Sequence, residues 1–390
     1  MLSITKGAVT GAILAALAFG LAAAPVKAQD IKVGITISMT GPAASLGLPQ
    51  QKSIALLPAE IAGHKIEYLL LDDGSDTTKA VSNARKFIDE SNVDAIIGSS
   101  TTPVSLAMID VVADKQVPMI SLAASQAVIA PMDAKRRWVF KMPQNDSLMA
   151  DAVAEHMAAN GVATVGFIGF ADAYGDGWLR ETQRAFAAKN IKLVAIERYN
   201  RTDTSVTGQV AKILTAQPDA VLIVGSGTPA ALPQKTLREL GYMGKYYQTH
   251  GVANLDFLRV GGKDVEGTFL PAGPIVIANQ LSDDNPAKRV ALTYIEAFEK
   301  ANGTGSVAFG SYAYDAGLLL QHAIPAALQK AAPGTVEFRQ ALRDALEATH
   351  ELPVANGVMS MSADNHNGLD RRARVMLMIE NGKWTLLPQH

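Results

Sequence analysis

Two turns rich in serine and threonine carry the residues best suited to hold a small anion. One reads Gly98-Ser99-Ser100-Thr101-Thr102-Pro103 and the other Gly225-Ser226-Gly227-Thr228-Pro229, and each follows a short apolar run. Thr-Pro favours a helix start after each turn, because threonine caps helices and proline fits the first helical position. Singly, each turn is also an ordinary strand–helix connection. Hydroxyls and free N–H groups at helix starts attract a carboxylate or phosphate, so one turn in each half predicts two facing walls of one cleft.

No catalytic or metal-binding constellation accompanies these turns. The seven histidines form no His-Glu-x-x-His pair, and the absence of cysteine excludes thiolate nucleophiles, disulfides and Cys-based zinc sites. Gly225-Ser226-Gly227 lacks the spacing of a nucleophile elbow, and Ala230 only weakly completes a dinucleotide fingerprint. The acidic run from Asp72 to Asp76 lacks the other ligands of a calcium loop, and we interpret it as a solvated turn. We expect no catalytic residue, cofactor or metal; a periplasmic enzyme or ligand-sensing regulator is the less favoured alternative.

The elements that position the turns alternate between strand-like apolar runs and helical patterns. Strands are expected at 31–37, 66–71, 95–97 and 118–120, then at 164–168, 192–196 and 220–224. Helices are expected at 77–89, 103–115, 146–160, 175–189, 204–217, 229–240, 286–302, 312–330 and 336–349, with closing strands near 375–379 and 383–387. This succession predicts parallel sheets covered by helices on both faces. Both turns then lie at carboxyl ends of strands, where such sheets bind ligands.

The N-terminus has the composition of a secretory signal peptide. Lys6 precedes an apolar run over residues 8–24, and Val26-Lys27-Ala28 offers a cleavage site after Ala28. A membrane anchor is less favoured, because the run is rich in Gly and Ala rather than strongly apolar. About 360 residues then remain, more than one hydrophobic core usually serves, so two domains are expected. A net charge of −2 gives no basic surface for nucleic acid or anionic lipid.

A series of short segments, in this order and spacing, resembles the branched-chain amino-acid (Leu/Ile/Val) type of ABC-transporter substrate-binding protein, the type I periplasmic binding fold. The segments are Ile31 to Pro42, Leu71 to Asp73, Ile97 to Thr101, Met119 to Ser125, Tyr174 to Gly177, His250 to Asn254 and Tyr312 to Ala316. The resemblance covers nearly the whole mature chain. It implies a non-catalytic, monomeric receptor in the periplasm that delivers a small molecule to the permease and ATPase subunits of an ABC importer.

The resemblance also implies an α/β fold of two doubly wound parallel-sheet lobes joined by a three-segment hinge. The expected division is a signal peptide at 1–28, a first lobe at 30–142 plus 275–353, and a second lobe at 143–274 plus 354–390. The crossings then fall near Met142-Pro143, Pro271 to Pro274 and Pro353 to Asn356. Each crossing lies beside a proline, as expected of a hinge with restricted freedom.

In the family, hydroxyls and backbone N–H groups of the first lobe hold the ligand's carboxylate. The implied ligand-binding residues here are Ser99, Ser100, Thr101, Ala123 and Ser125 in the first lobe, and Tyr174, Ser226, Gly227 and His250 in the second. Amino-acid receptors of the family also bind the ligand's ammonium with an acidic residue just before the Gly-Val-Ala-Asn run. This chain has His250 at that position.

A histidine at this position would leave a buried α-ammonium without its counter-charge, which is costly. Neutral or protonated, His250 could instead donate to a hydroxyl, a ketone or a second carboxylate, and affinity would then vary between about pH 5 and 8 as the ring titrates. We therefore expect a small carboxylate ligand that is aromatic or otherwise not an amino acid. The alternative is a branched-chain or related amino acid whose ammonium is held elsewhere, with Glu197 and Asp172 as candidates.

Overall fold

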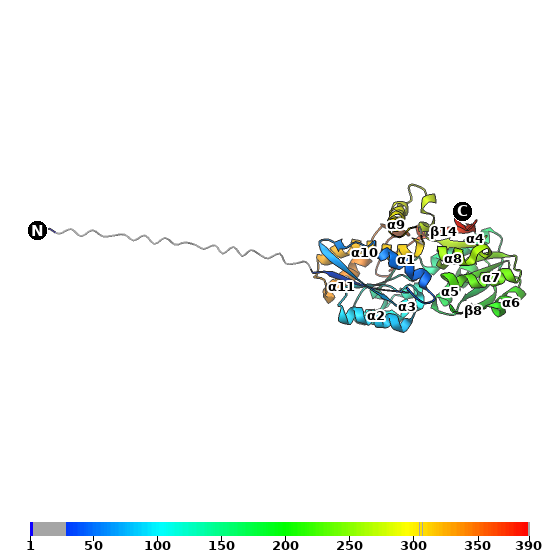
Figure 1. Ribbon diagram of the computed structural model, residues 1–390, viewed down its shortest axis with the longest axis horizontal. Helices are drawn as coiled ribbons and strands as arrows, with labels where there is room; N and C mark the ends of the chain where they lie inside the picture. Colours follow the sequence, from blue (N-terminus) through cyan, green and yellow to red (C-terminus); the bar gives the residue numbers. More distant parts are fainter. Residues whose placement is uncertain (3–28, 304, 306, 389–390) are drawn as a thin grey trace.

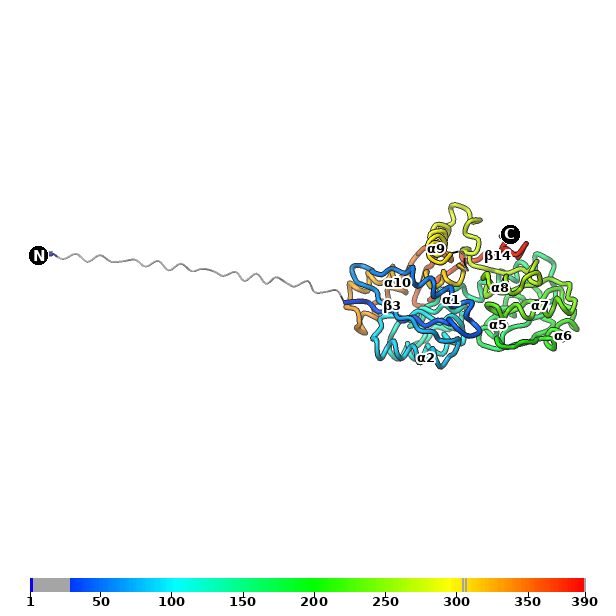
Figure 2. The backbone as a smooth tube through the Cα atoms, in the orientation of Figure 1, coloured from blue at the N-terminus to red at the C-terminus, as the bar shows by residue number. Residues whose placement is uncertain are grey.

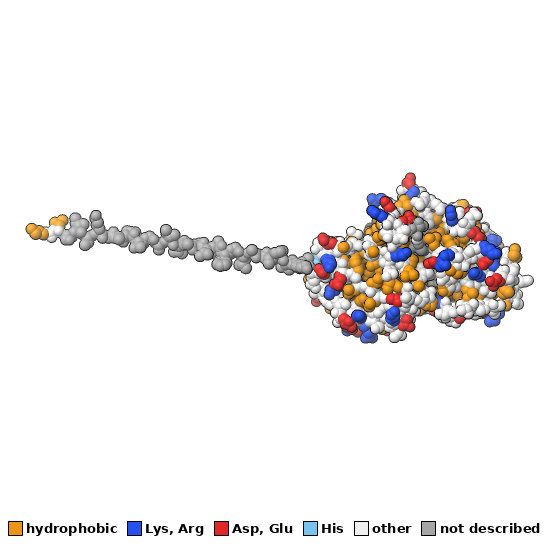
Figure 3. Space-filling model, in the orientation of Figure 1, with side chains coloured by type: hydrophobic (Ala, Val, Ile, Leu, Met, Phe, Trp, Pro, Cys, Tyr) orange, Lys and Arg blue, Asp and Glu red, His pale blue; other side chains and the backbone are white. Residues whose placement is uncertain are grey.

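The computed structural model describes residues 1–2, 29–303, 305 and 307–388. The expected signal peptide therefore lies almost wholly outside the described residues. Within them, no helix is both long and apolar enough to cross a membrane. On the face drawn in Figure 3, acidic and basic side chains are interspersed over both halves of the molecule, in keeping with the near-neutral net charge.

The first lobe is a sheet between two helical layers, and it lies beside the second lobe (Figures 1 and 2). Its strand order is β2-β3-β1-β4-β5-β6, and all neighbours except β2 and β3 run parallel. The strands are β1 (Ile31–Ile37), β2 (Glu60–Ile61), β3 (His64–Asp72), β4 (Ala95–Ile97), β5 (Met119–Ser121) and β6 (Val139–Lys141). The helices are α1 (Ala44–Ile54), α2 (Thr77–Arg85), α3 (Thr102–Asp114), α9 (Pro286–Asn302), α10 (Val307–Leu328) and α11 (Val336–Glu347). One apolar cluster joins the sheet to α10 and α11, and another joins it to α2 and α3.

The second lobe has a larger sheet, which is parallel except for two antiparallel pairings at one edge. Its order is β15-β14-β11-β10-β9-β7-β8. The strands are β7 (Thr164–Phe170), β8 (Lys192–Tyr199), β9 (Ala220–Val224), β10 (Lys245–Gln248), β11 (Phe269–Ala272), β14 (Val375–Glu380) and β15 (Lys383–Leu386). The helices are α4 (Asp146–Ala159), α5 (Ala173–Ala187), α6 (Thr207–Thr215), α7 (Ala231–Glu239) and α8 (Leu255–Gly261). Every residue of β4 and of β9 is buried, as expected of central strands covered on both faces.

The expected alternation of strands and helices in two doubly wound lobes is confirmed. The sequence reading did not include β2, β6, β10, β11, α1, α8 or the small hairpin of β12 (Leu352–Val354) and β13 (Gly357–Met359). After this hairpin the chain stays against the first lobe: the ring of His366 stacks on Phe140, with centroids 4.1 Å apart, and Asn367 Nδ2 donates to the carbonyl oxygen of Lys141. We therefore propose that the third crossing lies near residues 369–374, later than the expected Pro353 to Asn356.

Candidate functional site

A cavity of about 30 Å³ lies between the lobes, where the carboxyl ends of several strands meet. It has room for about two water molecules, so a larger ligand enters only if the lobes or lining side chains move apart. Its lining contains Leu46, Ser100, Thr101, Thr102, Leu122, Ala124, Pro143, Tyr174, Arg201, Ser226, His250, Gly251, Phe309 and Tyr312. Five of the expected site residues are therefore brought together here: Ser100, Thr101, Tyr174, Ser226 and His250. Ser99, Ala123, Ser125 and Gly227 lie close in sequence to lining residues but are not part of this lining.

The hydroxyls of Ser99 and Ser100 are engaged within the protein. Ser99 Oγ donates to Asp73 Oδ2 over 2.7 Å. Ser100 Oγ donates to Gln50 Oε1 over 2.6 Å and accepts from the N–H of Ser38 over 3.0 Å. The proton of each hydroxyl is therefore used to hold the turn, and Ser100 faces the cavity with its remaining acceptor capacity.

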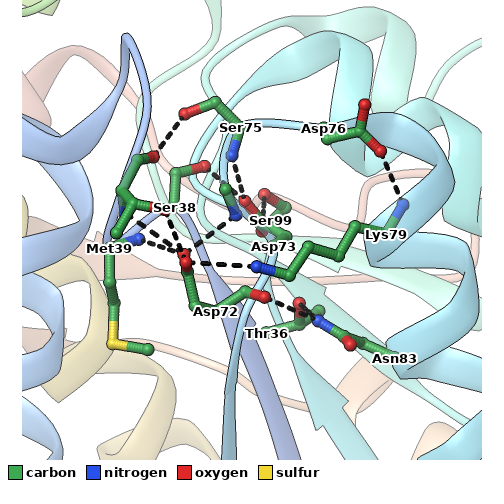
Figure 4. Close-up of polar contacts among 12 residues, drawn as sticks. Thr36, Ser38, Met39, Asp72, Asp73, Ser75, Asp76, Lys79, Asn83 and Ser99 are labelled. Atoms are coloured by element: carbon green, nitrogen blue, oxygen red, sulfur yellow. Dashed lines mark hydrogen bonds and ion pairs between the residues drawn. The ribbon is translucent and has the colours of Figure 1, made fainter.

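Asp73 anchors this turn, and the expectation of a solvated turn is wrong for it. Its carboxylate is fully buried and accepts from Ser38 Oγ, Ser99 Oγ and the N–H of Ser75 (Figure 4). Burial raises the pKa of Asp73, and the hydrogen bonds from Ser99 and Ser38 oppose that rise. The carboxylate is buried because it joins the ends of β1, β3 and β4. Asp73 thus fixes the position of the Ser99-Ser100 turn through its hydrogen bond with the Ser99 hydroxyl.

Asp72, next to it, organises the turn after β1 at the surface. Its carboxylate accepts from Met39 N–H, Thr40 N–H, Thr40 Oγ1 and Gly74 N–H, and it pairs with Lys79 over 3.3 Å (Figure 4). Slight burial raises its pKa, but the hydrogen bonds from Thr40, Gly74 and Lys79 prevail and lower the pKa to about 2.

No group of acidic or histidine side chains in the described chain could hold a metal ion.

The start of α3 presents the least engaged polar groups of the first lobe. Thr101 is the N-cap residue, and its side chain makes no capping hydrogen bond. Thr102 is 2% exposed, and its Oγ1 has no hydrogen-bond partner among the described residues. Buried hydroxyls are normally satisfied, so an unpaired one beside a cavity at a helix start is suited to an anion. The sequence reading assigned Thr101 to the site but not Thr102, although both belong to one Thr-Thr-Pro run.

Ser125 lies deeper, where the two lobes touch. Its Oγ accepts from the N–H of Ala127 over 3.3 Å, and the next N–H, of Gln126, donates to the buried carboxylate of Asp146 over 2.7 Å. A Cβ at Gly177 of α5 would lie 2.7 Å from Ser125 Oγ and 2.8 Å from Asp146 Oδ2. Burial raises the pKa of Asp146. Ser125 and Asp146 therefore form a tight interlobe contact with α5.

A chain of hydroxyls fixes Tyr174 on the second-lobe wall. Tyr174 Oη donates to Thr249 Oγ1 over 2.8 Å, and Thr249 Oγ1 donates to the carbonyl oxygen of Gly225 over 2.8 Å. Asp172 caps α5 by accepting from the N–H groups of Tyr174 and Gly175. Tyr174 therefore presents its ring and only an acceptor lone pair to the cavity.

Arg201 is a lining residue that the sequence reading missed. It follows β8 and pairs with Asp172 through Nε and Oδ2, 2.7 Å apart. Its Nη1 donates to Ser226 Oγ over 3.0 Å, and its guanidinium carbon lies 4.1 Å from the centre of the Phe170 ring. No motif marks this arginine in the sequence; only the folding of β8 beside β7 brings it to the cavity.

His250 is buried beside the cavity without a partner. It is 3% exposed, and neither ring nitrogen has a hydrogen-bond partner among the described residues. Burial, and to a lesser extent the nearby Lys141, lowers the pKa of His250 to about 3. The expectation that this ring titrates between pH 5 and 8 is therefore wrong for the ligand-free protein, because a buried imidazole stays neutral at those pH values. A neutral ring offers one N–H donor and one acceptor nitrogen.

The two alternative partners for an ammonium group are engaged elsewhere. Glu197 pairs with Lys212 over 3.2 Å. Asp172 pairs with Arg201 and caps α5. Neither residue belongs to the lining, and the lining contains one arginine and no acidic residue.

The mouth of the cleft is closed by a direct contact between lobes. Gly227, in the turn after β9, has a positive φ of 62° and lies against the start of α1. A Cβ at this position would collide with Ser45 Oγ and lie 2.8 Å from Leu46 Cδ1. Glycine is therefore required twice here, for the backbone conformation and for the close approach.

Comparison with known proteins places this geometry in context. A family model described as "Periplasmic binding protein" matches residues 30–383. The Leu/Ile/Val-binding protein BraC3 of Rhizobium johnstonii is 26% identical over 363 residues, covering 90% of this chain and 92% of that protein. The crystal structure of an extracellular ligand-binding receptor from Rhodopseudomonas palustris HaA2 is 46% identical, with a TM-score of 0.89 over 92% of this chain and 99% of that chain. An R. palustris solute-binding protein in complex with benzoate shares the fold at 21% identity, with a TM-score of 0.78 over 92% and 95% of the two chains.

Proposed function

Because the chain belongs to the type I periplasmic binding proteins of the branched-chain amino-acid ABC-transporter class, we propose that its ligand is a small carboxylate without an α-amino group. Members of this family are solute-binding receptors that deliver small molecules to the permease and ATPase subunits of an importer. This chain is such a receptor, and aromatic carboxylates are the class that its cleft favours.

The observation that carries this proposal is that the described lining of the cavity contains no acidic residue. An α-ammonium enclosed here would meet the guanidinium of Arg201 and a neutral His250, and no acidic residue lines the cavity. Burying a cation without a counter-charge costs several kcal/mol. A carboxylate, in contrast, meets the start of α3 and the unpaired Thr102 hydroxyl.

The remaining walls suit an aromatic or apolar body. Leu46, Leu122, Tyr174, Phe309 and Tyr312 also line the cavity. The benzoate complex of the R. palustris solute-binding protein supports the idea that this fold can enclose an aromatic acid. The names of the Leu/Ile/Val-binding relatives favour the alternative, a branched-chain amino acid. Glu197 is paired with Lys212 and Asp172 with Arg201, which disfavours that alternative because neither carboxylate is available to an ammonium group.

Calorimetric titration of leucine, valine, benzoate and 4-hydroxybenzoate against the wild-type protein tests the proposal. We expect heat from the aromatic acids and none from the amino acids. His250→Ala should weaken 4-hydroxybenzoate binding, whereas His322→Ala, an exposed histidine on α10, serves as the control. Micromolar leucine binding with no response to any aromatic acid would refute the ligand class and leave the receptor role standing.

We also propose that residues 1–28 are a signal peptide and that the mature protein begins at Gln29 or Asp30 in the periplasm as a monomer. The support is the apolar run over residues 8–24 and the Val26-Lys27-Ala28 site. Mass spectrometry of protein released from the periplasm should give this N-terminus. Intact Met1 in the membrane fraction would contradict it.

A further inference from the structure

Arg201 is held in place on three sides by groups of its own lobe. Asp172 binds Nε, Ser226 binds Nη1, and the guanidinium lies 4.1 Å from the Phe170 ring centre. Its side chain is only 15% exposed. These contacts leave three of its five N–H donors without a partner among the described residues. A guanidinium held in this way keeps its free donors pointed in a fixed direction, which favours a specific partner.

The charge of Arg201 is already balanced. Asp172 Oδ2 lies 2.7 Å from Arg201 Nε, so the pair brings no net charge to the cavity wall. A second ligand carboxylate at this wall would therefore be a buried anion without a counter-charge of its own. A neutral oxygen acceptor would use the free donors without that cost.

His250 lies close to Arg201 along the same wall. Ser226, which binds Arg201, also lies against Gly251, since a Cβ on Gly251 would be 2.9 Å from Ser226 Cβ. His250 precedes Gly251, and neither of its ring nitrogens has a hydrogen-bond partner within the described part of the chain. A hydroxyl can satisfy both residues, because it can accept from Arg201 and donate to the acceptor nitrogen of the neutral imidazole. An ether or a ketone could satisfy only Arg201 and an imidazole N–H.

We infer that Arg201 is a specificity-determining residue which, together with His250, recognises a neutral hydroxyl at the end of the ligand opposite its carboxylate. The inference rests on the proposed function, which places the carboxylate at Thr102 and the start of α3. The ligand class is then a hydroxylated monocarboxylate, with its two polar ends held by different lobes. Such a ligand links the lobes and stabilises their closed arrangement.

The test compares ligands that differ only at the far end. Calorimetry would use benzoate with 4-hydroxybenzoate, hexanoate with 6-hydroxyhexanoate, and terephthalate as the dicarboxylate. The first variant is Arg201→Lys, which keeps the charge opposite Asp172 but loses the planar guanidinium and its fixed N–H donors. The second is the double variant Asp172→Asn, Arg201→Met, which removes both charges. The matched control is Arg198→Met, since Arg198 also pairs with an aspartate and lies 5.9 Å from a phenylalanine ring centre, but is not part of the lining.

In the wild type we expect the hydroxylated member of at least one pair to bind roughly tenfold more tightly than its partner, as one hydrogen bond to a charged group allows. Both Arg201 variants should reduce this preference to about twofold or less while changing the affinity of the unhydroxylated acid little. Arg198→Met should leave the preference intact. Circular dichroism would confirm that each variant is folded.

Three results would overturn the inference. Equal wild-type affinity for both members of each pair would show that no hydroxyl is recognised. An equal loss for both members in the Arg201 variants would place the carboxylate itself at Arg201. Terephthalate binding as tightly as 4-hydroxybenzoate would show that the wall accepts a second charge. Binding of leucine or valine with no binding of any acid in the set would instead refute the proposed function, so the two failures are distinct.

Discussion

Individual residues of the cleft differ in whether their polar groups are already engaged. Ser99 and Ser100 look like ligand contacts in the sequence, but their protons go to Asp73 and Gln50. Thr102 and His250 are buried and have no partner within the described chain. An unpaired buried polar group costs free energy. A hydrogen bond from a ligand to either of these two residues would remove that cost and so favour binding.

Removing the Thr102 hydroxyl should weaken carboxylate binding. Thr102→Val keeps the shape of the side chain but removes an expected charge-assisted hydrogen bond, so affinity should fall about tenfold. Thr102→Ser keeps the hydroxyl and is the matched control. Calorimetry with benzoate or another bound acid measures both. An unchanged affinity in Thr102→Val would move the carboxylate away from the start of α3.

His250 should make the ligand-free protein less stable in acid. Its pKa is about 3 in the folded protein and about 6.5 when unfolded. Between these values the unfolded chain binds the proton and the folded protein does not, so stability falls as the pH drops below about 6.5. From pH 7 to pH 5 the loss due to this one group is about 2 kcal/mol.

Urea unfolding at pH 7 and pH 5 would measure this effect. His250→Gln cannot titrate, so its free energy of unfolding should fall by about 2 kcal/mol less than that of the wild type over the same interval. The other titrating groups are common to both proteins, so the comparison isolates His250 together with its coupling to Lys141. Equal losses in the two proteins would mean that the imidazole is accessible to protons in the folded state.

At the scale of elements, the strand-end turns serve both the binding and the closure of the cleft. The turn after β4 is anchored by Asp73 beneath it and opens α3. The turn after β9 begins a 3-10 turn at Thr228–Ala230 before α7, and its Gly227 meets α1 of the other lobe. The paired turns are thus similar in sequence but differ in use: one presents hydroxyls, and the other makes the interlobe contact.

Adding a methyl group at Gly227 should hold the cleft open. Gly227→Ala places a Cβ against Ser45 and Leu46, so the closed state becomes rarer and apparent affinity falls in proportion, by about tenfold if a tenth of the molecules can still close. Gly241→Ala is the control, since Gly241 also has a positive φ, of 81°, but nothing lies near its Cβ position. Both variants carry the conformational cost of about 1–2 kcal/mol.

Calorimetry and small-angle X-ray scattering together separate closure from stability. Gly227→Ala should bind weakly and stay expanded when ligand is added, whereas Gly241→Ala should bind and contract like the wild type. If the two variants behave alike, then closure does not depend on this contact.

For the whole molecule, one buried polar cluster lies beside the proposed crossings between the lobes. Gln144 Nε2 donates to the carbonyl oxygen of Ala373 over 2.9 Å, and Gln144 Oε1 accepts from Tyr312, which also lines the cavity. Asn356 Nδ2 donates to Ser311 Oγ and to Asp315 Oδ2, each over 2.8 Å. Burial raises the pKa of Asp315 to about 7, against the effect of its hydrogen bonds from residues 355 and 356. Tyr312 therefore connects the cleft to the hinge.

A methyl group at Gly273 should disturb this hinge without touching the ligand. Its φ of −70° is accessible to any residue, but a Cβ there would lie 2.5 Å from Asn356 Oδ1 and 2.8 Å from Gln144 Nε2. We expect Gly273→Ala to weaken every ligand by the same factor, roughly tenfold, because only the closing equilibrium changes. Titration of two different acids measures this, with Gly208→Ala on α6, where nothing lies near the Cβ position, as control. A change in the ratio of the two affinities would contradict a hinge effect.

The residue patterns by themselves determined most of the alternation of strands and helices and the two strand-end turns. These features follow from local periods and helix-start residues, which act within a few positions of the chain. The two-lobed arrangement came from the family resemblance. The strand β9 and the helix α9 begin and end at the expected residues. The equally short strands β4 and β5 were expected from their apolar runs, whereas β6, β10 and β11 were missed, because Lys141, Gln248 and Pro271 interrupt the apolar pattern there.

Only the tertiary structure decided which of the candidate side chains face the cavity. Arg201 reaches it because β8 lies beside β7, and Asp73 is buried because β1, β3 and β4 end together. The neutrality of His250 depends on burial and on Lys141, which lies 109 positions earlier in the chain. These properties arise from contacts between distant segments, and no local pattern in the sequence encodes them.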